Sequence, residues 1–279
     1  MMPKHAMTTH AFASIPVPER QDKPRTRGLN MMIDWGMGLQ RQADTLESAG
    51  LYIDNAKIAA SIPRVMPREV LERKLALYRQ HGISPMIGGL FTELAYMQGN
   101  ASKLFDEALA VGFGSLEVSD NLITYPQGEK ARMIRACAAS GLKAYAEVGR
   151  KEGALNDDAF MADIAECLDA GAVGVYLEAY ELFAQGQTRT GLIERITQAF
   201  PAERIVYELP VVILPGVTRD FKHKITAWLV KTLGTEVNLA NIEWDELYIT
   251  EIARRGMAGD ASHPQGAYRL AGFEASEHG

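Results

Sequence analysis

A repeat of about 30 residues constrains the fold of this chain more than any other feature of its sequence. Glutamates close short apolar runs at intervals of 30, 31 and 30 residues, at Glu117, Glu147, Glu178 and Glu208. Glycines precede such runs at intervals of 32, 30, 29 and 30 residues, at Gly50, Gly82, Gly112, Gly141 and Gly171. A strand, a loop, a helix and a turn together need about 30 residues, so each period predicts one βα unit.

Eight such units fit within the 279 residues, and the simplest closed structure they form is a (β/α)8 (TIM) barrel of the α/β class. The predicted strands occupy residues 29–34, 52–58, 84–89, 114–120, 142–147, 173–178, 204–210 and 236–242. We expect one barrel domain at 29–261, an irregular N-terminal extension at 1–28 and a polar C-terminal tail at 262–279. The extension lacks periodicity, so we expect it to be mobile or to lie on a neighbouring subunit.

Composition and charge exclude several classes of protein. The 35 acidic and 29 basic residues give a formal charge of -6, which argues against a nucleic-acid binder because such proteins need a basic face. No stretch approaches the apolar length of a membrane span. The cysteines, Cys137 and Cys167, are expected to be buried free thiols in a reducing compartment. We therefore expect a cytoplasmic protein with no nucleic-acid or membrane partner, and a homo-oligomer because barrels of this size often self-associate.

The recurrent acids are candidate site residues because the active site of a barrel gathers at the carboxyl ends of its strands. Asp34 ends the first strand and is a candidate metal ligand or general base, with a loop or N-cap acid as the equal alternative. Glu93 follows the third strand and either faces the mouth or caps a helix. Together with Glu117, Glu178 and Glu208, these acids offer the oxygen ligands that a hard cation such as Mg²⁺ prefers.

Cations and amides stand near the same strand ends. Lys57 stands near the end of an otherwise buried second strand and needs an anionic partner, either a substrate or a neighbouring glutamate. Strand alternation predicts that Ser119 shares an inward face with Glu117, as Tyr145 does with Glu147.

The loops after these strands carry further candidates. Asp120 ends the fourth strand, and Arg150 and Lys151 enter the loop after the fifth. Asn238 and Asn241 belong to the eighth strand, near the place where barrels commonly bind phosphate.

Several familiar motifs are absent from the sequence. It has no GxGxxG, Walker, HExxH, CxxC or GxSxG pattern, and its six histidines avoid the predicted strand ends. A histidine-ligated metal, a Ser-His-Asp hydrolase and an organic cofactor are therefore not expected.

Six segments together resemble the phosphosulfolactate synthase family of (β/α)8 barrels. They are residues 88–96, 116–120, 147–151, 169–172, 237–242 and 254–260, in the family's order and with compatible spacing. The resemblance implies a Mg²⁺-dependent addition of sulfite to phosphoenolpyruvate, which leads toward coenzyme M or another sulfonate. It implies that Lys151 is the general acid and that Lys57 matches a family lysine. It also implies that acids matching Asp34, Glu147, Glu178 and Glu208 hold the metal or shape the site.

The chain departs from the family pattern where a substrate would be bound. The family has Asp-Lys-Gly after the first strand, whereas this chain has Trp35 at the lysine position. The family has Glu-x-Arg-Glu after the sixth strand, whereas this chain has Tyr180 at the arginine position. Each lost contact between a cation and a phosphate costs about 1.5–3 kcal/mol, so two losses weaken binding by roughly 100-fold or more.

Three hypotheses follow from these residues. The first is the family lyase reaction on a small anionic substrate, with Lys57, Glu147 and Lys151 as catalytic residues. The second keeps the barrel but gives it a different, less anionic small carboxylate, with Trp35 and Tyr180 lining the pocket. The third is a non-catalytic barrel with a binding or stress-related role.

Overall fold

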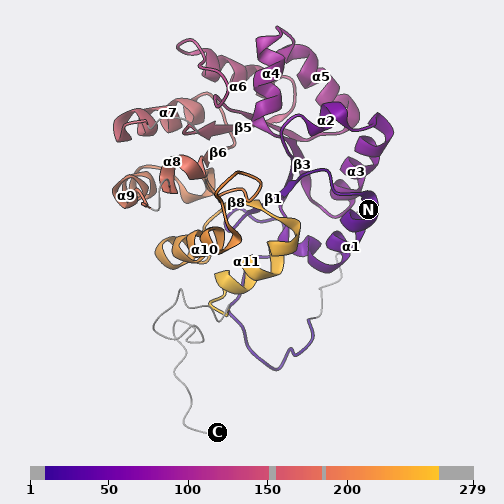
Figure 1. The fold of residues 1–279 in the computed structure, drawn as a ribbon, viewed down its shortest axis with the longest axis vertical. Coiled ribbons are helices and arrows are strands. Elements are labelled where there is room, and N and C mark those ends of the chain that lie inside the picture. The colour runs from indigo at the N-terminus through magenta and orange to yellow at the C-terminus, as the bar shows by residue number, and fades with distance from the viewer. Residues whose placement is uncertain (1–9, 151–154, 184–186, 258–279) are drawn as a thin grey trace.

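The computed structural model describes residues 10–150, 155–183 and 187–257. Its strands form one closed parallel barrel, in which each strand pairs with the next along the chain and β8 returns to β1 (Figure 1). The strands are β1 (Asn30–Asp34), β2 (Asn55–Ile58), β3 (Ser84–Ile87), β4 (Ser115–Val118), β5 (Lys143–Val148), β6 (Gly174–Leu177), β7 (Ile205–Glu208) and β8 (Leu239–Ile242). The predicted (β/α)8 fold is confirmed, and every strand overlaps the segment predicted for it.

Helices surround the barrel (Figure 1). Within the described residues the α-helices are α1 (Leu39–Ala49), α2 (Ile62–Val65), α3 (Arg68–Gln80), α4 (Gly89–Met97), α5 (Ala101–Val111), α6 (Glu129–Ala139), α7 (Asp157–Asp169), α8 (Ala179–Phe183), α9 (Thr190–Ala199), α10 (Arg219–Leu233) and α11 (Leu247–Arg254). Short 3-10 helices are η1 (Gly50–Tyr52), η3 (Ala202–Arg204) and η4 (Trp244–Glu246). The short α8 follows β6 directly, so it places its residues at the carboxyl end of the barrel.

Strand alternation divides the apolar side chains into two layers. Outward residues such as Leu116, Val118 and Ala144 pack with the helices in the main hydrophobic core. Inward residues form a second cluster inside the barrel, made of Met31, Met86, Tyr176, Val206 and Ala240. Because these side chains fill the middle of the barrel, the inward polar residues nearer the strand ends lie above an apolar plug.

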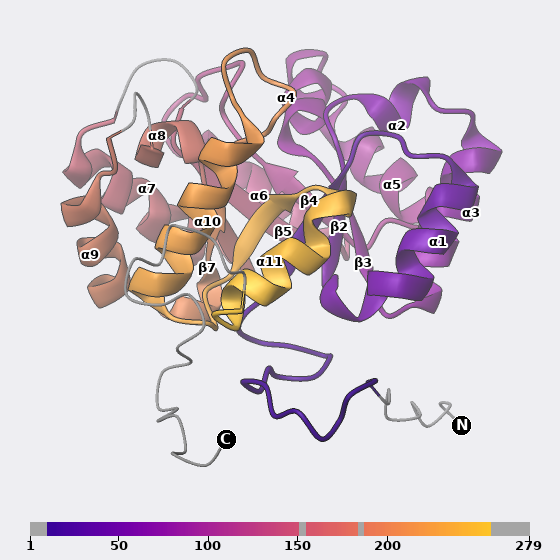
Figure 2. The ribbon, with the colours of Figure 1, turned by 60° about the horizontal axis from the view of Figure 1, so that its bottom comes forward.

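Part of the predicted N-terminal extension lies against its own barrel. Arg20 pairs with Glu251 at 3.0 Å, and Arg25 pairs with Asp54 at 3.1 Å. Figure 2 shows this segment at the end of the barrel opposite the loop that precedes α10. Residues 18–28 therefore cover the amino-terminal ends of the strands, and the carboxyl ends are left for a site.

Both cysteines are buried inside helices. Cys137 in α6 and Cys167 in α7 are free and buried, which confirms the predicted buried thiols. Burial raises the pKa of Cys137 to about 12 and also raises that of Cys167, so neither thiol ionises readily. Among the described residues, no helix has the length and apolar character needed to span a bilayer.

Candidate active site

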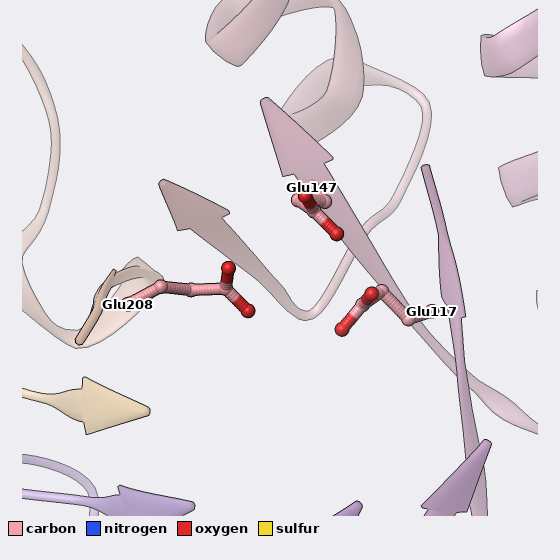
Figure 3. A group of neighbouring side chains, drawn as sticks. All are labelled: Glu117, Glu147 and Glu208. Carbon is pink, nitrogen blue, oxygen red and sulfur yellow. The ribbon is translucent and has the colours of Figure 1, made fainter. Parts of the chain in front are cut away.

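Inward-facing side chains from four strands meet near the carboxyl end of the barrel. One carboxylate oxygen from each of Glu117, Glu147 and Glu208 lies within 4.8 Å of the others, and all three residues are buried. Figure 3 shows these side chains reaching toward one another from different strands. The Lys57 ammonium lies 3.1 Å from Glu117 Oε2 and 2.9 Å from Glu208 Oε1. The structure thus brings together four residues that the sequence marked at separate strand ends; we call them the inner cluster.

Burial and mutual repulsion set the charges of the inner cluster. Burial raises the pKa of Glu117 to about 8; Lys57 opposes this shift, whereas Glu147 and Glu208 reinforce it. For Lys57, burial favours the neutral amine, but the neighbouring glutamates outweigh burial and hold its pKa above the usual range. Lys57 therefore stays charged, and Glu117 holds its proton to a higher pH than a free glutamate does.

A glycine allows the chain after β3 to approach the inner cluster. The backbone N–H of Gly89 donates to Glu117 Oε1 at 2.9 Å. A Cβ at this position would lie 2.1 Å from Ser119 Oγ and 2.8 Å from Glu117 Oε1. Only glycine fits here, because any side chain would collide with Ser119 and crowd the Glu117 carboxylate.

Glu93 organises the loop after β4. Its carboxylate accepts backbone N–H groups of residues 121–123 at 2.9, 2.5 and 3.1 Å, and it also accepts the Ser119 hydroxyl. The loop conformation lets Asn121 Nδ2 donate to Glu147 Oε1 at 2.6 Å. Asn121 was not among the predicted site residues, because an amide in an aperiodic loop carries no signal of its own. The contacts make Glu93 a scaffold for a residue that orients Glu147.

Asp34 faces the helix layer rather than the inside of the barrel. Its neighbour Ile33 lines the central cavity, so alternation sends Asp34 to the opposite side. Its carboxylate contacts Lys74 Nζ at 2.7 Å and accepts the Tyr78 hydroxyl at 2.6 Å. It also accepts two backbone N–H groups of the following loop at 2.8 and 2.9 Å. The structure therefore does not bring Asp34 to the inner cluster; the residue ties β1 to α3.

A cavity of about 690 Å³ opens above the inner cluster. Trp35 and Tyr180, the positions at which the resemblance implies cations, both line it. The Trp35 indole N–H donates to Glu243 at 3.3 Å. Glu178 also lines the cavity and accepts the backbone N–H of Tyr180 at 3.0 Å. Asn241 adopts a left-handed φ of 59°, which interrupts the alternation of β8, and it too lines the cavity.

Other predicted residues lie away from the cavity. Asn238 precedes β8, and its side chain bonds three backbone groups at 2.9 Å each. Asp120 pairs with Lys130 at 3.0 Å. The backbone N–H of Arg150 bonds a glutamate of α8 at 3.0 Å. Lys151 lies outside the described residues, so its role as general acid stays a prediction.

Comparison with known proteins identifies the family. The family model for (2R)-phospho-3-sulfolactate synthase (ComA) matches residues 18–260. The chain belongs to this family. The resemblance in the sequence is thereby confirmed, and the chain is an enzyme of the phosphosulfolactate synthase type.

Individual relatives cover most of the chain. The phosphosulfolactate synthase of Methanothermobacter thermautotrophicus is 29% identical over 254 residues, which span 87% of this chain and 94% of the relative. Protein HEAT-STRESS-ASSOCIATED 32 of Arabidopsis thaliana is 20% identical over 79% of this chain and 84% of its own length. Among solved structures, the carboxyl transferase domain of Rhizobium etli pyruvate carboxylase has a TM-score of 0.56 at 12% identity, over 80% of this chain and 40% of that one. That structural likeness shows the fold alone.

The inner cluster of this family member fits a metal ion. Carboxylate oxygens that converge from three strands are the ligands of a hard divalent cation. All three glutamates line the cavity, so a cation held between them would lie within reach of a ligand. The buried glutamates can therefore hold a metal ion beneath the cavity.

Proposed function

We propose that this family member catalyses a Mg²⁺-dependent addition of sulfite to the double bond of an enol-type carboxylate. Phosphoenolpyruvate is the most concrete substrate, and it would give (2R)-phospho-3-sulfolactate. The observation that carries the proposal is the inner cluster at the floor of the cavity, in a chain that the family model matches over residues 18–260. Barrel enzymes place their chemistry at this end of the strands.

The chemistry needs positive charge and one proton. The sulfur lone pair of sulfite forms a bond to the terminal carbon of the double bond, and the π electrons move toward the carbon that bears the carboxylate. The resulting enolate-like dianion takes up a proton at that carbon, and the phosphate ester stays intact. Bound Mg²⁺ would supply charge that stabilises the developing enolate.

Residues of the chain divide the remaining tasks. Glu117, Glu147 and Glu208 would hold the cation, and Asn121 keeps Glu147 oriented through its bond of 2.6 Å. Lys57 is held charged by the glutamates around it, so it contributes fixed positive charge at the floor. Lys151 would deliver the proton, as the resemblance implies.

A direct assay tests the proposal. The full chain is incubated with phosphoenolpyruvate, sulfite and Mg²⁺, and phosphosulfolactate is measured by ion chromatography and mass spectrometry. We expect product that depends on both substrates and disappears with a chelator. Absence of product above the enzyme-free background, with Mg²⁺ present, would remove phosphoenolpyruvate from the proposal.

The second candidate function keeps this chemistry for a different, less anionic carboxylate. It is favoured by the aromatic rings of Trp35 and Tyr180, which line the cavity where the family pattern has cations. Under this hypothesis, the double variant Trp35→Lys with Tyr180→Arg gains activity toward phosphoenolpyruvate. A double variant that stays folded and gains nothing would show that the lost cations do not explain the difference.

A binding or stress-related role without catalysis is the third candidate, and the Arabidopsis relative named for heat stress favours it. It predicts that the Glu147→Gln variant still restores the wild-type phenotype to a strain from which the gene has been deleted. Loss of complementation by this folded variant would assign the phenotype to the inner cluster.

A further inference from the structure

We infer that the cavity binds an acid with a branched aliphatic or aromatic substituent, whose acidic end points to the inner cluster and whose apolar group lies against the loop after β7. This inference deepens the proposed function and rests on it, because it takes the inner cluster as the reaction centre. Four features of the cavity carry it: the loop after β7, the corner beside β8, the aromatic walls and the polar floor.

The loop after β7 forms an apolar wall. Residues 209–211 and 213–217 all line the cavity, and apart from one glycine every side chain among them is apolar. Figure 2 shows this loop at the carboxyl end of the barrel, before α10. Ile213 and Leu214 remain 62% and 38% exposed. Apolar side chains held open beside a reaction centre mark a binding surface, because covering them with an apolar ligand group removes them from water.

The corner beside β8 is unsuited to phosphate. Barrels commonly bind phosphate with the loops after the seventh and eighth strands, next to the start of a short helix. Here the seventh loop is apolar, and the 3-10 helix η4 after β8 is preceded by Glu243 and contains Asp245 and Glu246. Lys222 lies 2.7 Å from Glu246, and Arg219 lies 2.9 Å from Asp245, so the cations beside this corner are already paired with its carboxylates. A phosphate would therefore gain little from them there.

Aromatic rings extend the apolar wall on both sides of the loop. Phe183 and Phe221 line the cavity with Trp35 and Tyr180. The bond of 3.3 Å from Trp35 to Glu243 holds the indole N–H, so the ring is fixed without a ligand. A cavity of about 690 Å³ is in the range that encloses ligands of some tens of atoms, well above the size of a three-carbon acid.

The floor supplies the polar contacts. Lys57 is buried there and held charged by Glu117 and Glu208. A ligand at the floor therefore meets a fixed cation that also contacts these two glutamates. Asn241 is buried and lines the cavity, and its Oδ1 has no hydrogen-bond partner within the described ranges. A buried acceptor of this kind calls for a donor, such as the hydroxyl of a 2-oxo acid in its enol form. The ligand is thus polar at the floor and apolar toward the loop.

Titrations of the full chain with four acids test this inference in the presence of Mg²⁺. The acids are pyruvate, 4-methyl-2-oxopentanoate, phenylpyruvate and phosphoenolpyruvate, and binding is followed by calorimetry. We expect 4-methyl-2-oxopentanoate and phenylpyruvate to bind at least about tenfold tighter than pyruvate, because each apolar group gains burial against the loop.

A matched pair of variants locates the binding surface. Leu214→Gln changes the wall, whereas Leu109→Gln makes the same change at a position of similar exposure, 40% against 38%, in α5. Leu214→Gln should remove most of the advantage of the apolar acids, and Leu109→Gln should leave it intact. Circular dichroism verifies that both variants remain folded.

The outcomes separate this inference from the proposed function. If phosphoenolpyruvate reacts with sulfite but the apolar acids neither bind nor compete, the inference is wrong and the proposed function stands. If the apolar acids bind through Leu214 but no acid reacts with sulfite, the binding site is supported and the proposed function fails. Equal loss of binding in Leu214→Gln and Leu109→Gln overturns the inference, because the loop would then contribute nothing specific.

Discussion

Two groups of buried charge lie near the carboxyl ends of the strands, on opposite faces of the same sheet. The outer group joins Asp34 of β1 to Lys74 and Tyr78 of α3. The inner cluster joins Lys57 to glutamates of β4, β5 and β7. In the outer group the carboxylate is fully occupied by protein donors, whereas in the inner cluster carboxylates from three strands converge at the floor of a cavity. A carboxylate saturated by protein donors stabilises a fold, and convergent carboxylates beside a cavity can receive a cation or a substrate.

The largest expected effect is on the activity of the inner cluster. Glu147→Gln keeps the shape of the side chain but removes one charge from the group that would hold the metal. We expect turnover to fall by about 10²-fold or more, because even a change behind a metal ligand costs about 10–100-fold, with little change in the midpoint of thermal unfolding. Steady-state kinetics at saturating Mg²⁺ measures this.

The control for that variant is Glu166→Gln, the same substitution at an exposed position of α7. It should leave turnover unchanged. Equal turnover in the two variants would mean that the inner cluster, like the outer group, serves only the fold and has no part in catalysis.

The outer group should show the opposite behaviour. Asp34→Ala leaves Lys74 as a buried charge without its carboxylate, which destabilises a fold by about 3–5 kcal/mol. Urea denaturation measures the free energy of unfolding. Binding of Mn²⁺, used as a paramagnetic substitute for Mg²⁺, should be unchanged in the folded variant because Asp34 does not reach the inner cluster.

Asp106→Ala in α5 provides the matched control, since Asp106 is exposed. Its free energy of unfolding should stay within about 0.5 kcal/mol of the wild type. If Asp34→Ala abolished Mn²⁺ binding while the chain remained folded, Asp34 would belong to the metal site after all.

The fold was predictable because one period recurs from Gly50 to Glu208. Acids and glycines at intervals of about 30 residues specify units of constant size, and parallel strands with helical connections close most simply as a barrel. Local pattern alone does not show how loops fold. The apolar wall at residues 209–217 and the bond from Asn121 to Glu147 depend on contacts between segments far apart in the sequence.

The candidate site was predictable only in part, and strand parity explains the difference. Lys57, Glu117 and Glu147 occupy positions whose side chains point into the barrel. The prediction that charged residues at strand ends lie together therefore applies to them. Asp34 carries the same signal but has the opposite parity, one residue beyond the inward Ile33. Residue type at a strand end therefore has to be combined with direction, which is set by the register of the sheet.

A smaller effect is expected on the pH dependence of stability. The pKa of Glu117 is raised by burial from 4.5 to about 8, so the folded state binds a proton that the unfolded chain has released. The free energy of unfolding without metal should therefore fall as the pH rises from about 4.5 to 8, by about 1–3 kcal/mol. Urea denaturation across this window should show the slope in the wild type and a shallower one in Glu117→Gln. Parallel curves would contradict the assignment.

The smallest effect concerns the link between the loop after β4 and the inner cluster. Asn121→Ala removes the donor to Glu147 Oε1 but no charge, so the carboxylate loses orientation and not its ligand atoms. We expect Mn²⁺ affinity to fall by about 5–30-fold, which corresponds to roughly 1–2 kcal/mol for a hydrogen bond to a charged group. Asn100→Ala, at a half-buried position of the α4–α5 connection, should leave the affinity unchanged. If both variants bound Mn²⁺ as the wild type does, Glu147 would be oriented by its strand alone, and the inner cluster would need no support from its loops.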